Sequence, residues 1–518
     1  MTVRRPLFTI PSMQHAAHGL RHRAARRLPV LACALVLAGC TSMAPPYERP
    51  PSALPAQFAD GSARPGAPAY ALDWRAYFAD PALQHLIDQA LVHNHDLRLA
   101  VLRVQEAQAS YGVQRSAGYP TLGLSADAAR ARTPATLSPS GSPVTANQYQ
   151  VGLGVSSWEV DFWGRIASLN ESALQSFLAT DAVRRATTVT LVAQVADAYF
   201  GLRELDERLH LAQESAGKQR ESLRIFTRRF ELGAASRLEL LQVQTLVTQA
   251  DALLVQLQQQ HGAQRHALDF LVGDTSALDA TPPAVQTMAN GQLPPLAVGL
   301  PSDLLLQRPD LLAAEHRIRA ANGQIGAARA AFFPSIRLTA GGGLASGELD
   351  KLFRGASRTW SFAPSLVLPI FDAGRNQSNL DLAQVRQNLA VVQYEQAVQS
   401  AFRDVADALS ARRWLSEQLL VHEQAHTVQQ ERARLSRLAY DNGASSFLDV
   451  LDAERTLISA TQQLAQTRGS LLSSQVALYR ALGGGAQHLG DAPLSPPSSS
   501  ASTSTSPSTP WPTLPRKH

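Results

Sequence analysis

Two similar turn sequences decide the fold of this chain. The first reads Arg229-Phe-Glu-Leu-Gly-Ala-Ala-Ser-Arg-Leu-Glu239, and the second reads Leu438-Ala-Tyr-Asp-Asn-Gly-Ala-Ser-Ser-Phe-Leu-Asp449. In each, a glycine suits the left-handed conformation that ends a helix, and a serine three residues later suits the cap of the next helix. An acid three residues further on completes a capping box. We therefore predict two helical hairpins, whose tips are marked by Gly233, Ser236, Gly443 and Ser446.

The similarity between the two turns continues upstream. Gly233 and Gly443 are 210 residues apart, and Val195-Ala-Asp-Ala198 recurs as Val405-Ala-Asp-Ala408 at the same offset. Several matches in one register indicate a duplicated unit. We divide the chain accordingly into a signal peptide (1–39), a lipidated extended tether (40–80), a first repeat (81–285), a second repeat (286–485) and a disordered tail rich in Ser, Thr and Pro (486–518).

Residues 1–39 have the composition of a secretory signal. They carry six arginines, no acid, and an apolar run that is too short to span a bilayer. Without them the net charge falls from +5 to −1, so the basic pI does not indicate a nucleic-acid partner. The end of this segment, Leu37-Ala-Gly-Cys40, resembles a bacterial lipobox, which implies lipidation of Cys40 and, with Thr41 following, sorting to the outer membrane. An ordinary signal with an incidental cysteine is the alternative, and Met13 is an alternative start.

Long helical patterns alternate with shorter segments of period two. At 1.5 Å per residue, the two longest uninterrupted patterns, at 166–231 and 376–441, each extend ~99 Å. We expect further helices over about 81–117, 237–272, 302–332 and 446–482. The helices at 237–272 and 446–482 return from the two tips, and those at 81–117 and 302–332 would stack end to end with them. Alternation predicts four strands, beginning near residues 122, 151, 336 and 362. Loops are expected at 131–147 and at Gly341-Gly-Gly343.

The number of strands constrains the oligomeric state. In a bilayer, an open four-stranded sheet would leave unpaired backbone groups in hydrocarbon, at a cost of several kcal/mol for each group. About eight strands make the smallest barrel, and a dozen or more leave a lumen. We predict a mainly α fold with a small β part: a trimeric 12-stranded β-barrel, with four strands from each chain, continued by a long α-helical barrel.

The sequence resembles the TolC-like outer-membrane factors, specifically the lipidated branch associated with multidrug efflux. The resemblance covers about residues 40–485, and its most specific stretches are 300–310, 320–329, Phe333-Pro334, 369–375 and 443–455. It implies a homotrimeric channel that is lipid-anchored in the outer membrane and extends into the periplasm. It also implies docking to a periplasmic adaptor protein and an inner-membrane pump.

The second turn contains the candidate channel gate. Asp449 and Asp452 are three residues apart on one helix face, and the resemblance places them where the family carries tunnel-lining aspartates. In a trimer they would form a ring of six carboxylates that favours cations. Capping is an alternative role for Asp449, worth about 1 kcal/mol. Tyr440 matches a family position that ties the closed tip together, but the arginine partner found five residues later in some members is Ser445 here.

The sequence contains no catalytic or metal-ligating constellation that its spacing supports. His93 and His95, for example, are two apart on a predicted helix and would not face each other. We therefore predict no enzyme, no cofactor and no metal site, but a passive exporter of drugs or other small molecules. A channel for type I protein or polysaccharide secretion is the nearest alternative. A structural trimeric coiled-coil surface protein and a lipid-anchored hydrolase are less favoured.

Overall fold

A computed structural model describes residues 43–51, 55, 58, 67–274, 293–298 and 307–488 of the chain. The predicted signal peptide and Cys40 lie outside these residues, as does the tail from residue 489 on. The tether is not wholly extended, because it contains the short helix α2 (Trp74–Tyr77). Before this helix, the short strand β1 (Ala67–Pro68) pairs in parallel with β4 (Leu296–Ala297). Among the described residues, none of the helices has the length and apolar character needed to cross a membrane.

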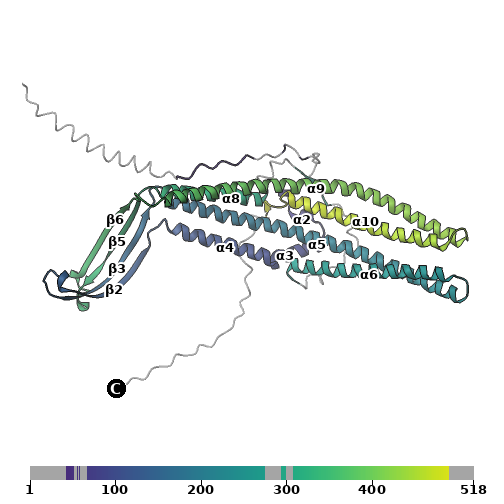
Figure 1. The fold of residues 1–518 in the computed structure, drawn as a ribbon, viewed down its shortest axis with the longest axis horizontal. Helices are drawn as coiled ribbons and strands as arrows, with labels where there is room; N and C mark the ends of the chain where they lie inside the picture. Colours follow the sequence, from purple (N-terminus) through teal and green to yellow (C-terminus); the bar gives the residue numbers. More distant parts are fainter. Residues whose placement is uncertain are drawn as a thin grey trace, which may run out of the picture. The chain divides into compact units, whose positions relative to one another are not determined.

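One compact unit comprises the described residues up to 51, together with 106–179 and 314–395. It contains an antiparallel sheet in the order β2-β3-β5-β6 (Figure 1), as the sequence predicted for four strands. Within the part of the chain described, β2 and β6 each pair with a single neighbour and are therefore the edges of this sheet. The strands are β2 (Leu122–Thr133), β3 (Val144–Val160), β5 (Ser335–Ser346) and β6 (Arg358–Val367).

The loop predicted at Gly341-Gly-Gly343 is wrong. These glycines lie inside β5, opposite Gly154, Leu153 and Gly152 of β3. A Cβ atom added to Gly343 would lie only 2.2 Å from the carbonyl oxygen of Val151. The glycines therefore let two strands approach closely instead of making a turn. The loop predicted over 131–147 is also too long, because β2 and β3 continue into it and leave only residues 134–143 between them.

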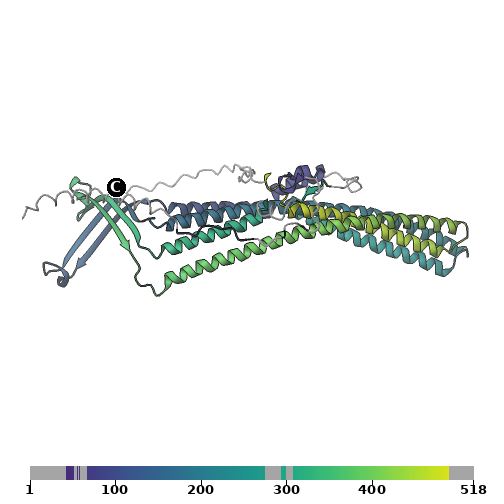
Figure 2. The same cartoon turned by 90° about the horizontal axis from the view of Figure 1, so that it is seen from above.

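The second compact unit comprises the described residues of 52–105, 180–313 and 396–488. Here α5 (Arg165–Glu231), from residue 180 on, turns into α6 (Arg237–Val272), and α9 (Arg375–Asp441), from residue 396 on, turns into α10 (Phe447–Ala481). The two predicted hairpins lie side by side with their tips at the same end (Figures 1 and 2). Both α5 and α9 have 67 residues, so each extends ~100 Å. Apolar residues of α5 at the 4-3-4-3 spacing of a coiled-coil seam are buried, namely Leu191, Val195, Ala198, Leu202 and Leu205.

The helices that return from the tips, α6 and α10, each end beside the start of another helix. The helix predicted over 81–117 is divided at Asn94 into α3 (Pro81–His93) and α4 (His95–Ser116). The buried Asn94 amide donates to the Leu271 carbonyl at the end of α6, at 2.9 Å. At the other junction, the Arg308 guanidinium donates to the Ala481 carbonyl at the end of α10, also at 2.9 Å, immediately before α8 (Pro309–Ala330). The end of α6 thus lies beside the start of α4, and the end of α10 lies beside the start of α8.

Candidate functional site at the hairpin tips

Both hairpin tips have the predicted local structure. Gly233 and Gly443 have φ angles of +70° and +73°, in the left-handed region that favours glycine. Ser236 caps α6: its hydroxyl accepts from the Glu239 N–H at 3.2 Å, and its own N–H donates to the Glu239 carboxylate at 2.6 Å. Ser446 caps α10 in the same way with Asp449. These caps fix where each returning helix begins and so which side chains face the other hairpin.

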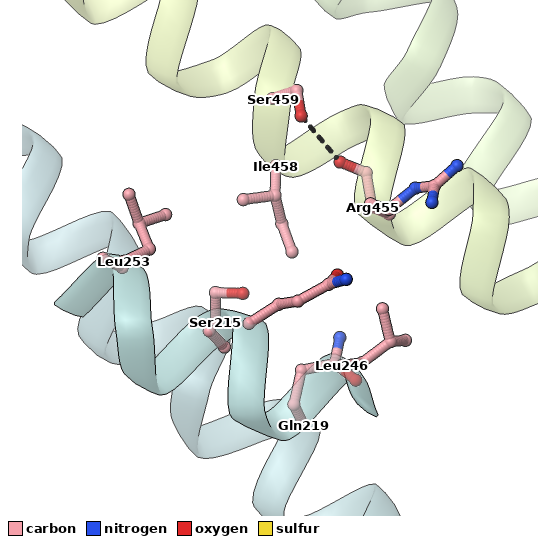
Figure 3. A pocket seen from close by; sticks show the side chains of 10 residues that line it. Ser215, Gln219, Leu246, Leu253, Arg455, Ile458 and Ser459 are labelled. Carbon is pink, nitrogen blue, oxygen red and sulfur yellow. Dashed lines mark hydrogen bonds between the residues drawn. The ribbon is translucent and has the colours of Figure 1, made fainter. Parts of the chain in front are cut away.

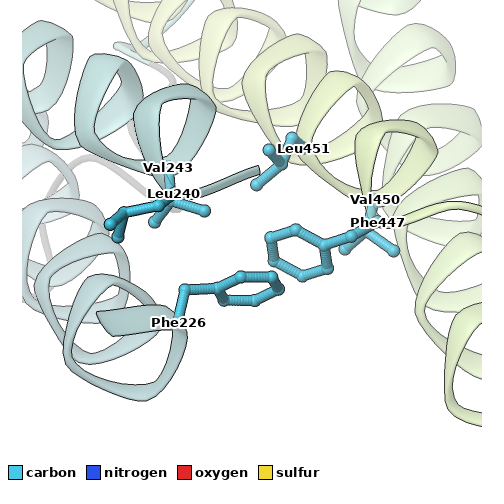
Figure 4. Close-up of a cluster of buried hydrophobic side chains, with 6 residues drawn as sticks. All are labelled: Phe226, Leu240, Val243, Phe447, Val450 and Leu451. Atoms are coloured by element: carbon cyan, nitrogen blue, oxygen red, sulfur yellow. The ribbon is translucent and has the colours of Figure 1, made fainter. Parts of the chain in front are cut away.

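An apolar cluster joins the two tips (Figure 4). The Phe226 ring of α5 and the Phe447 ring of α10 lie 4.1 Å apart between centroids, and both side chains are buried. Contact between the two hairpins at this level is therefore made by a water-excluding aromatic pair and its aliphatic neighbours. The cluster, which we call the tip core, consists of Phe226, Leu240, Val243, Phe447, Val450 and Leu451.

Asp449 is occupied by its capping role in this conformation. One oxygen of its carboxylate accepts from the Ser446 N–H at 3.1 Å and from the Ser446 hydroxyl at 2.8 Å. Both contacts lie within the turn that starts α10. The cap and the predicted gate role are compatible, because a capping carboxylate at an exposed turn keeps lone pairs for a second partner.

Asp452 is held by two arginines that the sequence analysis did not single out. Arg432 of α9 lies 2.6 Å from its carboxylate, and Arg455 of α10 lies 3.0 Å away. The hydrogen bond and charge of Arg432, supported by Arg455, lower the pKa of Asp452. Arg455 could have been found from its i, i+3 spacing. Arg432 could not, because only the register between α9 and α10 brings it opposite Asp452.

Tyr440 contacts a residue of the other hairpin. Its hydroxyl accepts a hydrogen bond from Arg229 of α5, and its ring lies 5.0 Å from the Phe447 ring. Ser445, the position where some family members carry the arginine, has a buried hydroxyl with no hydrogen-bond partner among the described residues. Arg229 thus supplies a cross-hairpin contact that no local sequence signal predicted.

Further from the tips, an open pocket of mixed polar and apolar lining lies between the hairpins. It has a volume of about 160 Å³ and is bordered by α5, α6 and α10, with Ser215, Gln219, Leu246 and Ile458 in its wall (Figure 3). The side chain of Gln219 donates to the Glu454 carboxylate across the interface at 3.0 Å. The pocket lining contains no acid, histidine or cysteine. The described residues hold no group of three or more His, Cys, Asp or Glu side chains that could bind a metal ion.

Comparisons with known proteins agree on one family. The family model described as "Outer membrane efflux protein" matches residues 86–274 and 300–484. The toluene efflux pump outer membrane protein TtgF of Pseudomonas putida is 41% identical over 474 residues, which cover 90% of this chain and 98% of the relative. The cation efflux system protein CusC of Escherichia coli is 38% identical over 459 residues, which cover 88% and 97%. The open state of the Neisseria gonorrhoeae MtrE outer membrane channel matches with a TM-score of 0.78 and 37% identity, over 86% of this chain and 98% of that one.

This chain belongs to the outer membrane efflux protein family. The resemblance inferred from the sequence is thereby confirmed, and so is the interpretation of the chain as an outer-membrane efflux channel. A channel for protein or polysaccharide secretion is not favoured. The family is one of efflux channels and is not a known enzyme family.

Proposed function

We propose that this protein forms a homotrimeric passive duct, which receives cargo from an inner-membrane pump through a periplasmic adaptor protein. The observation that carries this proposal is the open sheet, in which β2 and β6 each have one edge that no other described strand pairs with. In lipid, those edges require partners, and further copies of the same chain would supply them. Two 67-residue helices continue from this sheet and suit a tunnel wall. The duct catalyses no reaction, so the energy for transport comes from the pump.

The cargo consists of small molecules chosen by the pump. TtgF is named for toluene and CusC for cations, yet these relatives are 41% and 38% identical to this chain. Sequence similarity to these relatives therefore does not indicate whether the cargo is an apolar solvent or a metal ion. We assign this chain a general export role for drugs and other small molecules.

A lipid on Cys40 anchors the duct in the outer membrane. The first described residue, Met43, is held against α8, because its carbonyl accepts from Arg329 at 3.2 Å. Further along, Arg49 lies 2.8 Å from Glu315, which is only 5% exposed. These contacts hold the described residues that follow Cys40 in sequence beside α8.

Asp449 and Asp452 form the gate at the narrow, periplasmic end of the duct. We expect the protein in planar bilayers to conduct ions with a preference for cations. The double variant Asp449→Ala, Asp452→Ala should remain trimeric but lose cation preference severalfold, because Arg432 and Arg455 would remain without their counterion. Since the neighbouring arginines lower the pKa of Asp452, its contribution should persist at pH 5 and disappear only as pH falls through that lowered pKa.

Asp441→Ala is the matched control for the gate. Asp441 is an exposed acid at the same tip and lies 3.5 Å from Arg437 of its own helix. Its removal should leave ion selectivity near the wild-type value. Unchanged conductance, selectivity and divalent block in the double variant would count against the gate.

A further inference from the structure

We propose that His422 and His426 of α9 form a binding site for a zinc ion, with one such site in each chain. Both residues belong to the sequence His422-Glu-Gln-Ala-His426, which lies wholly within α9. From the sequence we predicted no metal site, so this proposal departs from that prediction. It also goes beyond the export role, because it does not require that several copies share one sheet.

The spacing of the two histidines suits a single metal ion. Residues four apart in an α-helix lie on the same face, with Cβ atoms about 5–6 Å apart. Two imidazole rings at this spacing can each direct a nitrogen at one zinc ion, at the usual Zn–N distance of about 2.0–2.1 Å. Zinc proteases use the pattern H-E-x-x-H on a helix in this way, and both histidines bind the metal. His93 and His95, by contrast, lie on two different helices.

Both imidazole rings are available to a ligand. His422 and His426 are half-buried. Within the part of the chain that the structure describes, neither ring takes part in a hydrogen bond or an ion pair. His261 of the same unit differs in this respect, because its Nε2 atom lies 2.9 Å from Asp206. A neutral imidazole keeps one nitrogen lone pair, so His422 and His426 can each donate one to a metal.

The duplicated hairpin shows that packing does not require histidines at these two positions. The offset of 210 residues makes Ala212 and Ala216 of α5 the counterparts of His422 and His426. Both alanines are 1% exposed and continue the 4-3-4 spacing of the coiled-coil seam beyond Leu205. Seam positions favour apolar side chains. Two imidazoles at consecutive seam positions of α9 are therefore better explained by a ligand than by packing.

The charges beside the histidines favour a cation. Glu423 is adjacent to His422 in the sequence, and its carboxylate lies 3.5 Å from the guanidinium of Arg468 of α10. The same guanidinium lies 4.0 Å from the carboxylate of Glu207 of α5. One arginine thus faces two carboxylates, which leaves a net negative charge near the site. A divalent cation would be attracted by this charge.

The arrangement indicates zinc binding and not zinc catalysis. Catalytic zinc sites combine three protein ligands with one open position. The described residues contain no group of three or more His, Cys, Asp or Glu side chains that could hold a metal ion. Glu423, which has the position of the general base in zinc proteases, faces Arg468 instead. Two imidazoles and water molecules would therefore hold the ion and link successive turns of α9.

Metal titration of the full-length chain tests the site. The protein is purified in detergent without a polyhistidine tag, stripped of metal with EDTA, and titrated with Zn²⁺ in competition with a fluorescent zinc indicator. We expect a single zinc ion per chain, and the double variant His422→Ala, His426→Ala should bind it at least ~10-fold more weakly. Cu²⁺ suits the same imidazole ligands. Electron paramagnetic resonance of the Cu²⁺-loaded protein should show coupling to two nitrogens, which the double variant should lose.

Two further variants are the matched controls. His93→Ala, His95→Ala removes two histidines elsewhere and should leave zinc affinity unchanged. His422→Ala, Ala425→His keeps the number of histidines but places them side by side in sequence, on different directions of the helix, and should bind as weakly as the double variant. Circular dichroism without zinc checks that each variant is folded. Wild-type zinc affinity in either His422 variant, or no zinc binding by the folded wild-type chain, would overturn the proposal.

Discussion

Replacing Phe447 with alanine should uncouple the two hairpin tips. The Phe447 ring is 5% exposed, packs 4.1 Å from the Phe226 ring and contacts the Tyr440 ring, so it joins α10 to α5 and α9. Removing a buried phenylalanine costs about 3–5 kcal/mol, and at this site much of that cost falls on contact between the hairpins. Amide hydrogen exchange in the tip segments should therefore accelerate at least ~100-fold. The closed channel in planar bilayers should also become leaky.

Leu448→Ala provides the comparison. Leu448 is the next residue of α10 but is 53% exposed and lies outside the tip core. Its truncation should change stability by no more than about 0.5 kcal/mol. If the Phe447 and Leu448 variants exchange at the same rate, the tip core does not hold the hairpins together.

Replacing Arg308 with alanine should also destabilise the second unit. The guanidinium is 11% exposed and lies 2.7 Å from Asp310 and 3.5 Å from Asp404 of α9. It also donates to the Ala481 carbonyl at the end of α10. Removal leaves this carbonyl without its donor and two partly exposed carboxylates without their shared cation, for which we expect a loss of about 1–3 kcal/mol. The thermal unfolding midpoint of the purified protein should fall, and Arg308→Lys should recover only part of it, because lysine cannot reproduce the forked contact.

Arg403→Ala is the control for the Arg308 variant. Arg403 lies beside Asp404, at 3.3 Å, but its side chain is 69% exposed. An exposed ion pair contributes about 0–1 kcal/mol, so its loss should move the midpoint little. Equal shifts of the unfolding midpoint for the Arg308 and Arg403 variants would show that Arg308 does not hold α8, α9 and α10 together.

Local signals in the sequence predicted most of the helical architecture. The Gly and Ser positions of the two tips and the absence of proline over 166–231 depend only on residues close in the chain. They predicted both capping boxes and the ends of α5 and α9 to within one residue. Four strands and their grouping in two hairpins were also predictable, because alternation and duplication reinforced each other.

Features that depend on register between distant segments were not predictable. Gly341-Gly-Gly343 has the composition of a turn, yet the close approach of β3 places it inside a strand. Asn94 interrupts a continuous helical pattern because the end of α6 offers a carbonyl for its amide. The partners of Tyr440 and Asp452, Arg229 and Arg432, come from segments that only hairpin packing brings near. The sequence therefore located the candidate site, but it did not predict which charged residues of distant segments contact Tyr440 and Asp452.

Imaging of the detergent-extracted protein tests the central claim most directly. The claim is that the described residues of one chain supply an open four-stranded part of a sheet that several copies must close. We expect particles with threefold symmetry, in which twelve strands form a continuous ring and long helices continue from it as a hollow cylinder. A single-chain particle whose β2 and β6 edges remain unpaired in detergent would contradict the claim.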